Sequence, residues 1–112
     1  FVARYESGPF YQIQVKSLRS NGYVFMQKDK FQPGESLYLA LGLLVEDQPP
    51  ELFLIPSTVW LTPNAVFVSR DYENLKSRPE WGLNVSKKNM TALESYRFGK
   101  TIKRVFSASE RG

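Results

Sequence analysis

The order of patterns along this sequence predicts a mixed α+β fold. Short runs rich in aromatic and β-branched residues, separated by Gly, Pro, Asn and Ser turn signals, fill the first two thirds of the chain. The clearest helical pattern comes only near the end. Since strands come first and the helix last, we expect an α+β or mixed α/β sheet. A chain of 112 residues, 42% hydrophobic, is enough for one domain with a single core.

A β-hairpin is expected at the N-terminus. Residues 1–6 and 10–18 are strand-like, and Ser7-Gly8-Pro9 between them is a turn signal. Side chains alternate along a strand, so Gln14 and Lys16 share one face of the second strand. The hairpin therefore offers an amide oxygen and an ammonium group to something outside the core.

Four more strands are expected, at residues 23–26, 37–45, 51–56 and 65–68. The run 37–45 is nearly all apolar, and periodicity alone does not separate a buried strand from a buried helix. Gly42 within it and Pro49-Pro50 after it favour a central strand ending in a turn. Residues 51–56 then form its antiparallel neighbour, ended by proline.

The helices are expected late in the chain. Ser57 or Thr58 is suited to cap a short helix. The charged residues 70–82 are expected to form a loop, because Arg78-Pro79 keeps the backbone extended.

The main helix is expected to start at Ser86, with Met90, Leu93 and Tyr96 on one face and Gly99 at its end. Residues 99–112 then form a basic tail, which is either a DNA-contacting arm or a frayed end.

Composition excludes several kinds of chemistry. The chain has no cysteine and no histidine, so disulfides, thiolate sites and Ser-His or Cys-His catalysis are excluded. Any metal must be a hard cation held by oxygen ligands. A net charge of +4 and a pI near 9.4 favour an anionic partner. No apolar run reaches the roughly 20 residues of a membrane span, and no signal peptide is visible, so we expect a cytoplasmic protein with no membrane association.

At Gln14-Val15-Lys16 the chain resembles the (D/E/Q)xK motif of the PD-(D/E)xK nuclease superfamily. The setting is similar too: a hairpin, an aromatic strand, a long apolar strand, the strand 52–57 with Trp60 behind it, and the run 81–86 leading into a helix. A group of uncharacterised microbial domains has this order of features. The likeness covers roughly residues 1–98 and implies a restriction-endonuclease-like mixed sheet with an N-terminal hairpin and a C-terminal helix.

The resemblance implies metal-dependent DNA hydrolysis. Mg²⁺ (or Mn²⁺) would be held by the Gln14 side-chain oxygen and the Val15 carbonyl, and Lys16 would orient the attacking water or stabilise the transition state. Gln14 and Lys16 are therefore the candidate catalytic residues. DNA is the implied partner, and a homodimer is compatible with the family, in which many nucleases act as dimers.

The chain departs from the family pattern in one respect. The first acid of the family lies on the preceding strand, about a dozen residues before the second motif. That position falls at or just before Phe1, which we expect to lie opposite Gln14, and Glu6 at the turn is too distant. We therefore expect residues 1–98 to be a nuclease-like domain without its N-terminal part, unable to cleave DNA alone.

Basic residues that could contact nucleic acid are Arg19, Lys28, Lys30, Lys103 and Arg104. The alternative for each is an ordinary charged surface. Tyr11, Tyr23 and Phe25 could stack on bases or belong to the core. Two other functions stay open: a non-catalytic nucleic-acid-binding module of the same fold, and a domain whose hairpin face binds a protein.

Overall fold

The structure, a computed structural model, describes residues 2–4, 10–72 and 76–111. Its strands are β1 (Val2–Arg4), β2 (Phe10–Leu18), β3 (Gly22–Gln27), β4 (Leu37–Leu43), β5 (Glu51–Pro56), β6 (Phe67–Arg70) and β7 (Glu80–Val85). Its α-helices are α1 (Met90–Leu93) and α2 (Phe98–Arg111), and its 3₁₀ helices are η1 (Lys28–Lys30), η2 (Ser57–Leu61) and η3 (Glu94–Tyr96).

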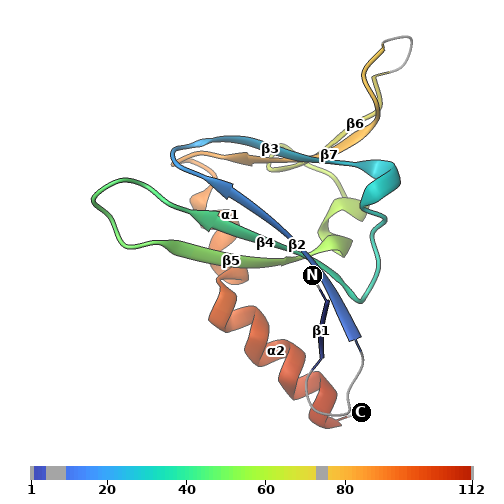
Figure 1. Ribbon diagram of the computed structural model, residues 1–112, viewed down its shortest axis with the longest axis vertical. Coiled ribbons are helices and arrows are strands. Elements are labelled where there is room, and N and C mark those ends of the chain that lie inside the picture. Colours follow the sequence, from blue (N-terminus) through green and yellow to red (C-terminus); the bar gives the residue numbers. More distant parts are fainter. Residues whose placement is uncertain (1, 5–9, 73–75, 112) are drawn as a thin grey trace.

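The strands form two sheets, shown in Figure 1. One has the order β1-β2-β4-β5 and the other β3-β7-β6. The pair β2–β4 is parallel and every other pair is antiparallel. The predicted mixed α+β class, with an N-terminal hairpin and a C-terminal helix, is confirmed.

The hairpin register is shifted by one residue from the expected one. Val2 pairs with Gln12, whereas Phe1 opposite Gln14 would have placed Val2 opposite Ile13. Phe1 and Glu6 themselves lie outside the described residues. Over the described pairs, residues 2–4 with 10–12, this shift by one residue exchanges the faces that meet across the two strands.

The predicted central strand is β4, and β5 is its antiparallel neighbour as expected. Alternate β4 side chains are buried, since Leu39 and Leu41 are at most 1% exposed, while Tyr38 and Ala40 on the other face are half-buried. This alternation gives a strand with one face on the core.

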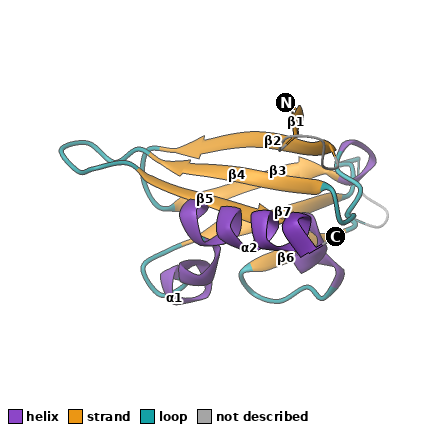
Figure 2. Ribbon diagram, turned by 90° about the horizontal axis from the view of Figure 1, so that it is seen from below, coloured by secondary structure: helices purple, strands orange, loops and turns teal. Residues whose placement is uncertain are grey.

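The core lies between the two sheets. Figure 2 shows β2 and β4 on one side and β7, β6 and α1 on the other. Trp60 of η2 is fully buried between them, packs edge-on against Phe31 and Phe67, and donates its indole N–H to the Gly82 carbonyl over 2.7 Å. Trp60 is therefore a packing residue that joins the two sheets.

The expected loop at residues 70–82 is confirmed for the described residues 71–72 and 76–79, but it is wrong at its ends, because Arg70 belongs to β6 and residues 80–82 belong to β7. Glu80 and Gly82 are unusual residues inside a strand, so the sequence does not indicate one here. Tyr23 on β3 explains why they occupy these positions. The Tyr23 hydroxyl donates to Glu80, and its ring lies over Gly82, where an added Cβ would collide with the Tyr23 oxygen. A polar residue and a glycine are thus required in a strand that sequence periodicity does not reveal.

The predicted helix from Ser86 to Gly99 is wrong in its extent. The Ser86 hydroxyl does accept from the Asn89 N–H, but regular helix begins at Met90 and breaks at Arg97, where the backbone is extended. Leu93 is buried in the core, and Met90 and Tyr96 pack against the same core, so the predicted shared face is confirmed.

Gly99, the expected end, lies in the first turn of α2. The expected basic tail after it is therefore helical through Arg111.

The predicted cap of the short helix is also wrong. The helix η2 begins at Ser57, with Pro56 as its cap and no side-chain hydrogen bond there. The buried Ser57 hydroxyl instead donates to the Gly34 carbonyl over 2.8 Å and accepts from the Gly34 N–H over 2.9 Å. It ties the turn before β4 to the end of β5.

Candidate functional site between β2 and β3

The candidate site arises where two consecutive strands separate. β2 and β3 leave one turn but join different sheets, so they diverge (Figure 1). In the described part of the chain β1 pairs with β2 only as far as Gln12, and β3 is an edge strand. A hollow of about 430 Å³ lies between these edges, lined by Gln14, Val15, Lys16, Phe25, Met26, Gln27 and Lys30.

Gln14 and Lys16 line this hollow together, and both are half-buried. They pair with Leu39 and Leu41 of β4, so they lie on the inner face of their sheet. Val15, on the outer face, is 68% exposed. Gln14 and Lys16 therefore lie neither in the apolar core nor on a flat surface. They lie at a part of the inner face that is open to solvent because β3 diverges from β2.

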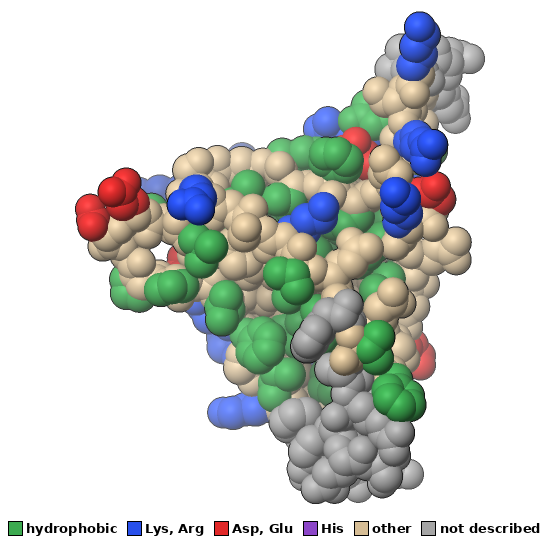
Figure 3. Space-filling view, viewed as in Figure 1, with side chains coloured by type: hydrophobic (Ala, Val, Ile, Leu, Met, Phe, Trp, Pro, Cys, Tyr) green, Lys and Arg blue, Asp and Glu red, His purple; other side chains and the backbone are tan. Residues whose placement is uncertain are grey.

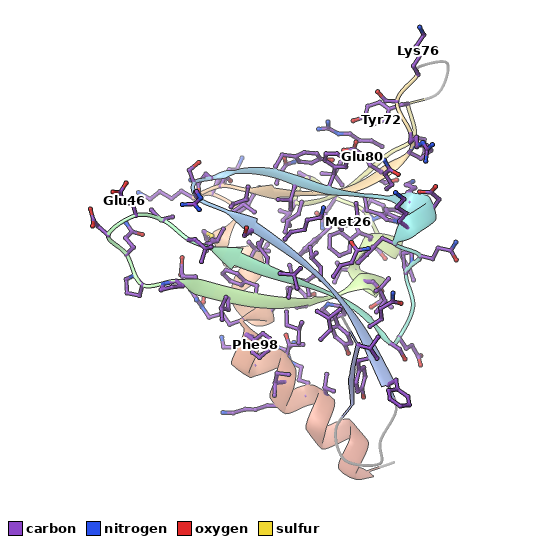
Figure 4. All side chains as sticks on the ribbon, viewed as in Figure 1. Met26, Glu46, Tyr72, Lys76, Glu80 and Phe98 are labelled. Atoms are coloured by element: carbon purple, nitrogen blue, oxygen red, sulfur yellow. The ribbon has the colours of Figure 1, made fainter. Side chains whose placement is uncertain are left out.

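The floor and the far wall come from β3. Met26 is 3% exposed, and Figure 4 shows it between the ribbons of β3 and β2. Phe25 is 48% exposed, so it is not a core residue. Sequence alternation leaves the role of Phe25 open, because only the tertiary structure shows that this face of β3 is uncovered.

One hydrogen bond crosses the hollow. The Gln14 amide donates through Nε2 to the Lys30 carbonyl over 3.1 Å, which ties β2 to η1. The Gln14 oxygen remains as an acceptor. Lys30 is therefore brought to the predicted motif by the chain that follows β3, although 16 residues separate it from Gln14.

The hollow is electropositive. Lys16 and Lys30 line it, and neither forms an ion pair with any described residue. Its described lining contains no carboxylate. Two unneutralised ammonium groups in a partly enclosed space attract an anion such as phosphate.

Gln27 is a site residue that no sequence pattern indicates. It lines the hollow, and its Oε1 is buried with no hydrogen-bond partner, the only such side-chain atom among the described residues. A buried acceptor without a donor costs about 1–3 kcal/mol. The local sequence does not indicate Gln27 as a site residue, because the lack of a hydrogen-bond donor for its Oε1 depends on how β3 packs in the tertiary structure.

Two of the predicted nucleic-acid residues, Arg19 and Lys28, are not among the residues that line the hollow. The Lys28 ammonium interacts with other groups. Its Nζ is 2.7 Å from both Asp71 and Ser69 and lies 4.0 Å from the Trp81 ring centre. Arg19 is exposed in the turn between β2 and β3.

Lys103 and Arg104 are not brought to the site. They are exposed on α2, which lies beyond β5, on the far side of the sheet from β3 (Figure 1). Arg104 donates to the Ser95 carbonyl. The predicted basic set is therefore divided between two separate regions.

A second polar cluster lies on the outer face of β3 and β7. The Tyr23 hydroxyl is 2.6 Å from Glu80, which is 8% exposed, and the Arg70 guanidinium lies 4.6 Å from the Tyr23 ring centre. Burial first, and then the hydrogen bond to Glu80, raise the pKa of Tyr23 above its ordinary value. Both charged groups of this cluster contact Tyr23: Glu80 binds its hydroxyl and Arg70 lies over its ring. Tyr23 is therefore a structural residue rather than a base-stacking one.

The described lining is a poor match for Mg²⁺ by itself. It supplies the Gln14 oxygen and the Val15 backbone carbonyl, but no carboxylate, and two ammonium groups stand beside them. The described residues contain no group of three or more acidic side chains that could hold a metal. Since Mg²⁺ relies on carboxylates, the lining does not fit the ion without ligands from outside the described residues.

Comparison with known proteins adds no family. No protein-family model matches the chain, and neither a curated protein nor a solved structure matches it. Among the helices that the structure describes, none is long and apolar enough to cross a membrane.

Proposed function

We propose that this chain carries the phosphate-binding side of a metal-dependent DNA endonuclease site of the PD-(D/E)xK type. One observation supports it most: Gln14 and Lys16, which resemble the family motif, line one electropositive hollow together with Lys30. A solvated strand face would leave these side chains spread over an open surface.

Each side chain has a distinct role in this proposal. The Lys16 ammonium contacts a non-bridging oxygen of the target phosphate and stabilises the charge that builds on it during hydrolysis. Lys30 holds a neighbouring phosphate. The hydrogen bond from Gln14 to the Lys30 carbonyl holds η1 next to β2. Both ammonium groups therefore stay at the same hollow.

Mg²⁺ or Mn²⁺ is part of the proposal as a group that this lining holds only in part. Gln14 and the Val15 carbonyl would be two ligands of such an ion, and carboxylates would have to complete the set, because the described lining supplies none. The chemistry that such an ion would supply is a lower pKa for a bound water and a charge to offset that of the phosphate. Without those carboxylates the chain binds DNA and does not cleave it.

DNA binding tests the phosphate site. Fluorescence anisotropy with a short labelled duplex is expected to show affinity falling as salt rises, since Lys–phosphate contacts release counterions. Lys16→Gln and Lys30→Gln are each expected to reduce the salt slope by about 1. Lys103→Gln, on the far side of β5, is the matched control with a smaller effect. A slope unchanged by both hollow variants contradicts the proposal.

Cleavage tests the enzymatic part. This chain with plasmid DNA and Mg²⁺ is expected to give no nicking above a Lys16→Ala control. The family pattern has an acid about a dozen residues before the second motif, so a chain extended before Phe1 to carry an acid at that position is expected to nick DNA, and Lys16→Ala to abolish that. Absence of nicking by the extended chain, with DNA binding intact, favours a non-catalytic nucleic-acid-binding module.

A third function has one observation in its favour. The outer face of the larger sheet carries exposed apolar side chains, including Val15 at 68% and Leu52 at 53%. Figure 3 shows hydrophobic side chains gathered over β4, β5 and part of β2. If this face joins two copies, sedimentation will show a dimer that Val15→Glu converts to a monomer. A monomer at all concentrations excludes that assembly.

A further inference from the structure

The hollow between β2 and β3 contains more than a phosphate site. Beside its two lysines it has an aromatic side chain, Phe25, that is 48% exposed, and an amide oxygen, on Gln27, that has no donor among the described residues. The resemblance to a nuclease motif accounts for neither of them.

These two groups call for different chemistry from the lysines. A phosphate oxygen accepts hydrogen bonds from ammonium groups, but it has no N–H to give to the Gln27 oxygen. A ligand that satisfies the whole lining must therefore carry an anion, an N–H donor and a flat face for Phe25. A nucleotide has all three, and its base is reachable only when it is not stacked inside a duplex.

We infer that the hollow takes a nucleotide of single-stranded DNA, with its base stacked on Phe25 and its phosphates on Lys16 and Lys30. The Gln27 amide, whose oxygen is buried in the free chain, turns toward the base and accepts a hydrogen bond from the amino group of the base. This inference rests on the proposed function and names its substrate class. Basic grooves with exposed aromatic side chains are the common means of binding single strands. The volume of about 430 Å³ falls within the roughly 300–1,000 Å³ of small-molecule sites.

The test compares strands that share a backbone and differ in their bases. Anisotropy is measured with a labelled oligonucleotide of about 8 nucleotides, a length within the site sizes of single-strand binders, with an abasic strand of equal length, and with a duplex. The single strand is expected to bind more tightly than both. Equal affinity for normal and abasic strands overturns the inference.

Phe25 is tested by substitution. Phe25→Ala is expected to weaken single-strand binding about 5- to 150-fold, as loss of one stacking contact does, and to leave abasic binding unchanged. Phe25→Trp, which keeps an aromatic ring, is expected to retain single-strand binding. Phe25→Leu, which keeps only an apolar side chain, is expected to weaken it as Phe25→Ala does. Phe98→Ala is the control: Phe98 is 40% exposed and, as Figure 4 shows, lies at α2, beyond β5. Equal losses for Phe25→Ala and Phe98→Ala overturn the stacking role.

Gln27 is tested with two pyrimidines. Cytosine has an amino donor where thymine has an acceptor, so a cytosine strand is expected to bind about 2- to 12-fold more tightly than a thymine strand, the range of one net hydrogen bond. Gln27→Met, similar in size but without the amide, removes this preference. Equal binding of both strands by the unmodified chain overturns the amide's role.

The two levels of proposal fail differently. If no DNA of any kind binds, both the proposed function and this inference fail. If the duplex binds with a Lys16-dependent salt slope while single strands gain nothing from their bases, only the inference fails.

Discussion

At Gly82 the absence of a side chain is needed for the present packing of β3 against β7. A Cβ there would overlap the Tyr23 hydroxyl oxygen and the adjoining ring carbons. Tyr23 cannot easily move away, because Glu80 holds its hydroxyl and Arg70 lies against its ring.

Gly82→Ala is therefore expected to lower the free energy of unfolding by about 1–3 kcal/mol, as overpacking does. Gly99→Ala is the matched control. Gly99 lies in α2, and nothing lies within 4 Å of the position that an alanine Cβ would occupy, so alanine should raise the free energy of unfolding by up to about 1 kcal/mol. Urea unfolding of both variants gives the comparison, and a neutral Gly82→Ala would show that the Tyr23 ring is displaced at little cost.

The Tyr23 hydroxyl has a consequence for stability at high pH. Its pKa is raised in the folded chain, chiefly by burial, so the folded state keeps the proton after the unfolded state begins to lose it near pH 10. Stability from this group is fully present below pH 10 and falls as pH rises further.

Tyr23→Phe removes that pH dependence. The variant is expected to be less stable at pH 7, since Glu80 loses its donor, and its deficit should shrink above about pH 10. Urea midpoints of both proteins between neutral and alkaline pH provide the measurement. Tyr38, whose pKa is also raised by burial, stays in both proteins and cancels in the comparison. A deficit that stays constant with pH contradicts the assigned cause.

At the scale of elements, α2 is joined to the larger sheet through β5. The buried Thr101 hydroxyl donates to the Leu54 carbonyl of β5 over 2.7 Å. Just before the helix, Arg97 pairs with Glu51 and Glu94 and lies against the Phe53 ring. Arg97 thus fixes the point at which the chain turns from η3 into α2.

Thr101→Val keeps the shape of the side chain and removes the hydroxyl. It is expected to cost about 1–3 kcal/mol, because the buried Leu54 carbonyl loses a donor. Faster amide hydrogen exchange in α2 should accompany the change. Thr101→Ser retains the donor and should lose less. If the valine variant is as stable as the serine variant, the hydrogen bond does not hold the helix.

Glu94 gives the same junction a pH dependence at the acid end. The hydrogen bond from Arg97 is the main reason that the pKa of Glu94 lies below its usual value. A lowered folded pKa means that this contribution is present at neutral pH and lost as pH falls through the folded value. Glu94→Gln should therefore differ from the unmodified chain at pH 7 and match it in strong acid, as thermal unfolding can show.

Across the complete fold, Trp60 joins the two sheets. It follows β5 of the larger sheet and donates to Gly82 in the central strand of the smaller one. The hollow exists only while both sheets hold their relative positions, since β2 and β3 belong to different ones.

Trp60→Phe keeps an aromatic ring but loses the indole donor and part of the volume. It is expected to lower the free energy of unfolding by about 2–4 kcal/mol, from the orphaned Gly82 carbonyl and the space left behind. Hydrogen exchange should speed up together in β4 and β7. Loss of protection confined to one sheet would show that the sheets unfold separately.

Local side-chain pattern is enough to predict strands and helices wherever pattern and burial agree. Alternation in β4, the proline at the end of β5 and the face shared by Met90, Leu93 and Tyr96 are local properties, and each is present as expected. The sequence also places Gln14 and Lys16 on one face of β2, because strand geometry fixes that relation.

Which face of β2 meets solvent, and what stands opposite it, depends on the packing of the two sheets. Sheet membership follows from pairings between distant strands, such as β2 with β4, and no local pattern encodes them. For the same reason the sequence does not reveal β7: its Glu80 and Gly82 are matched to Tyr23, which lies 57 residues before Glu80. The hollow, with Lys30, Phe25 and Gln27 around the predicted pair, exists because β3 leaves β2 for another sheet.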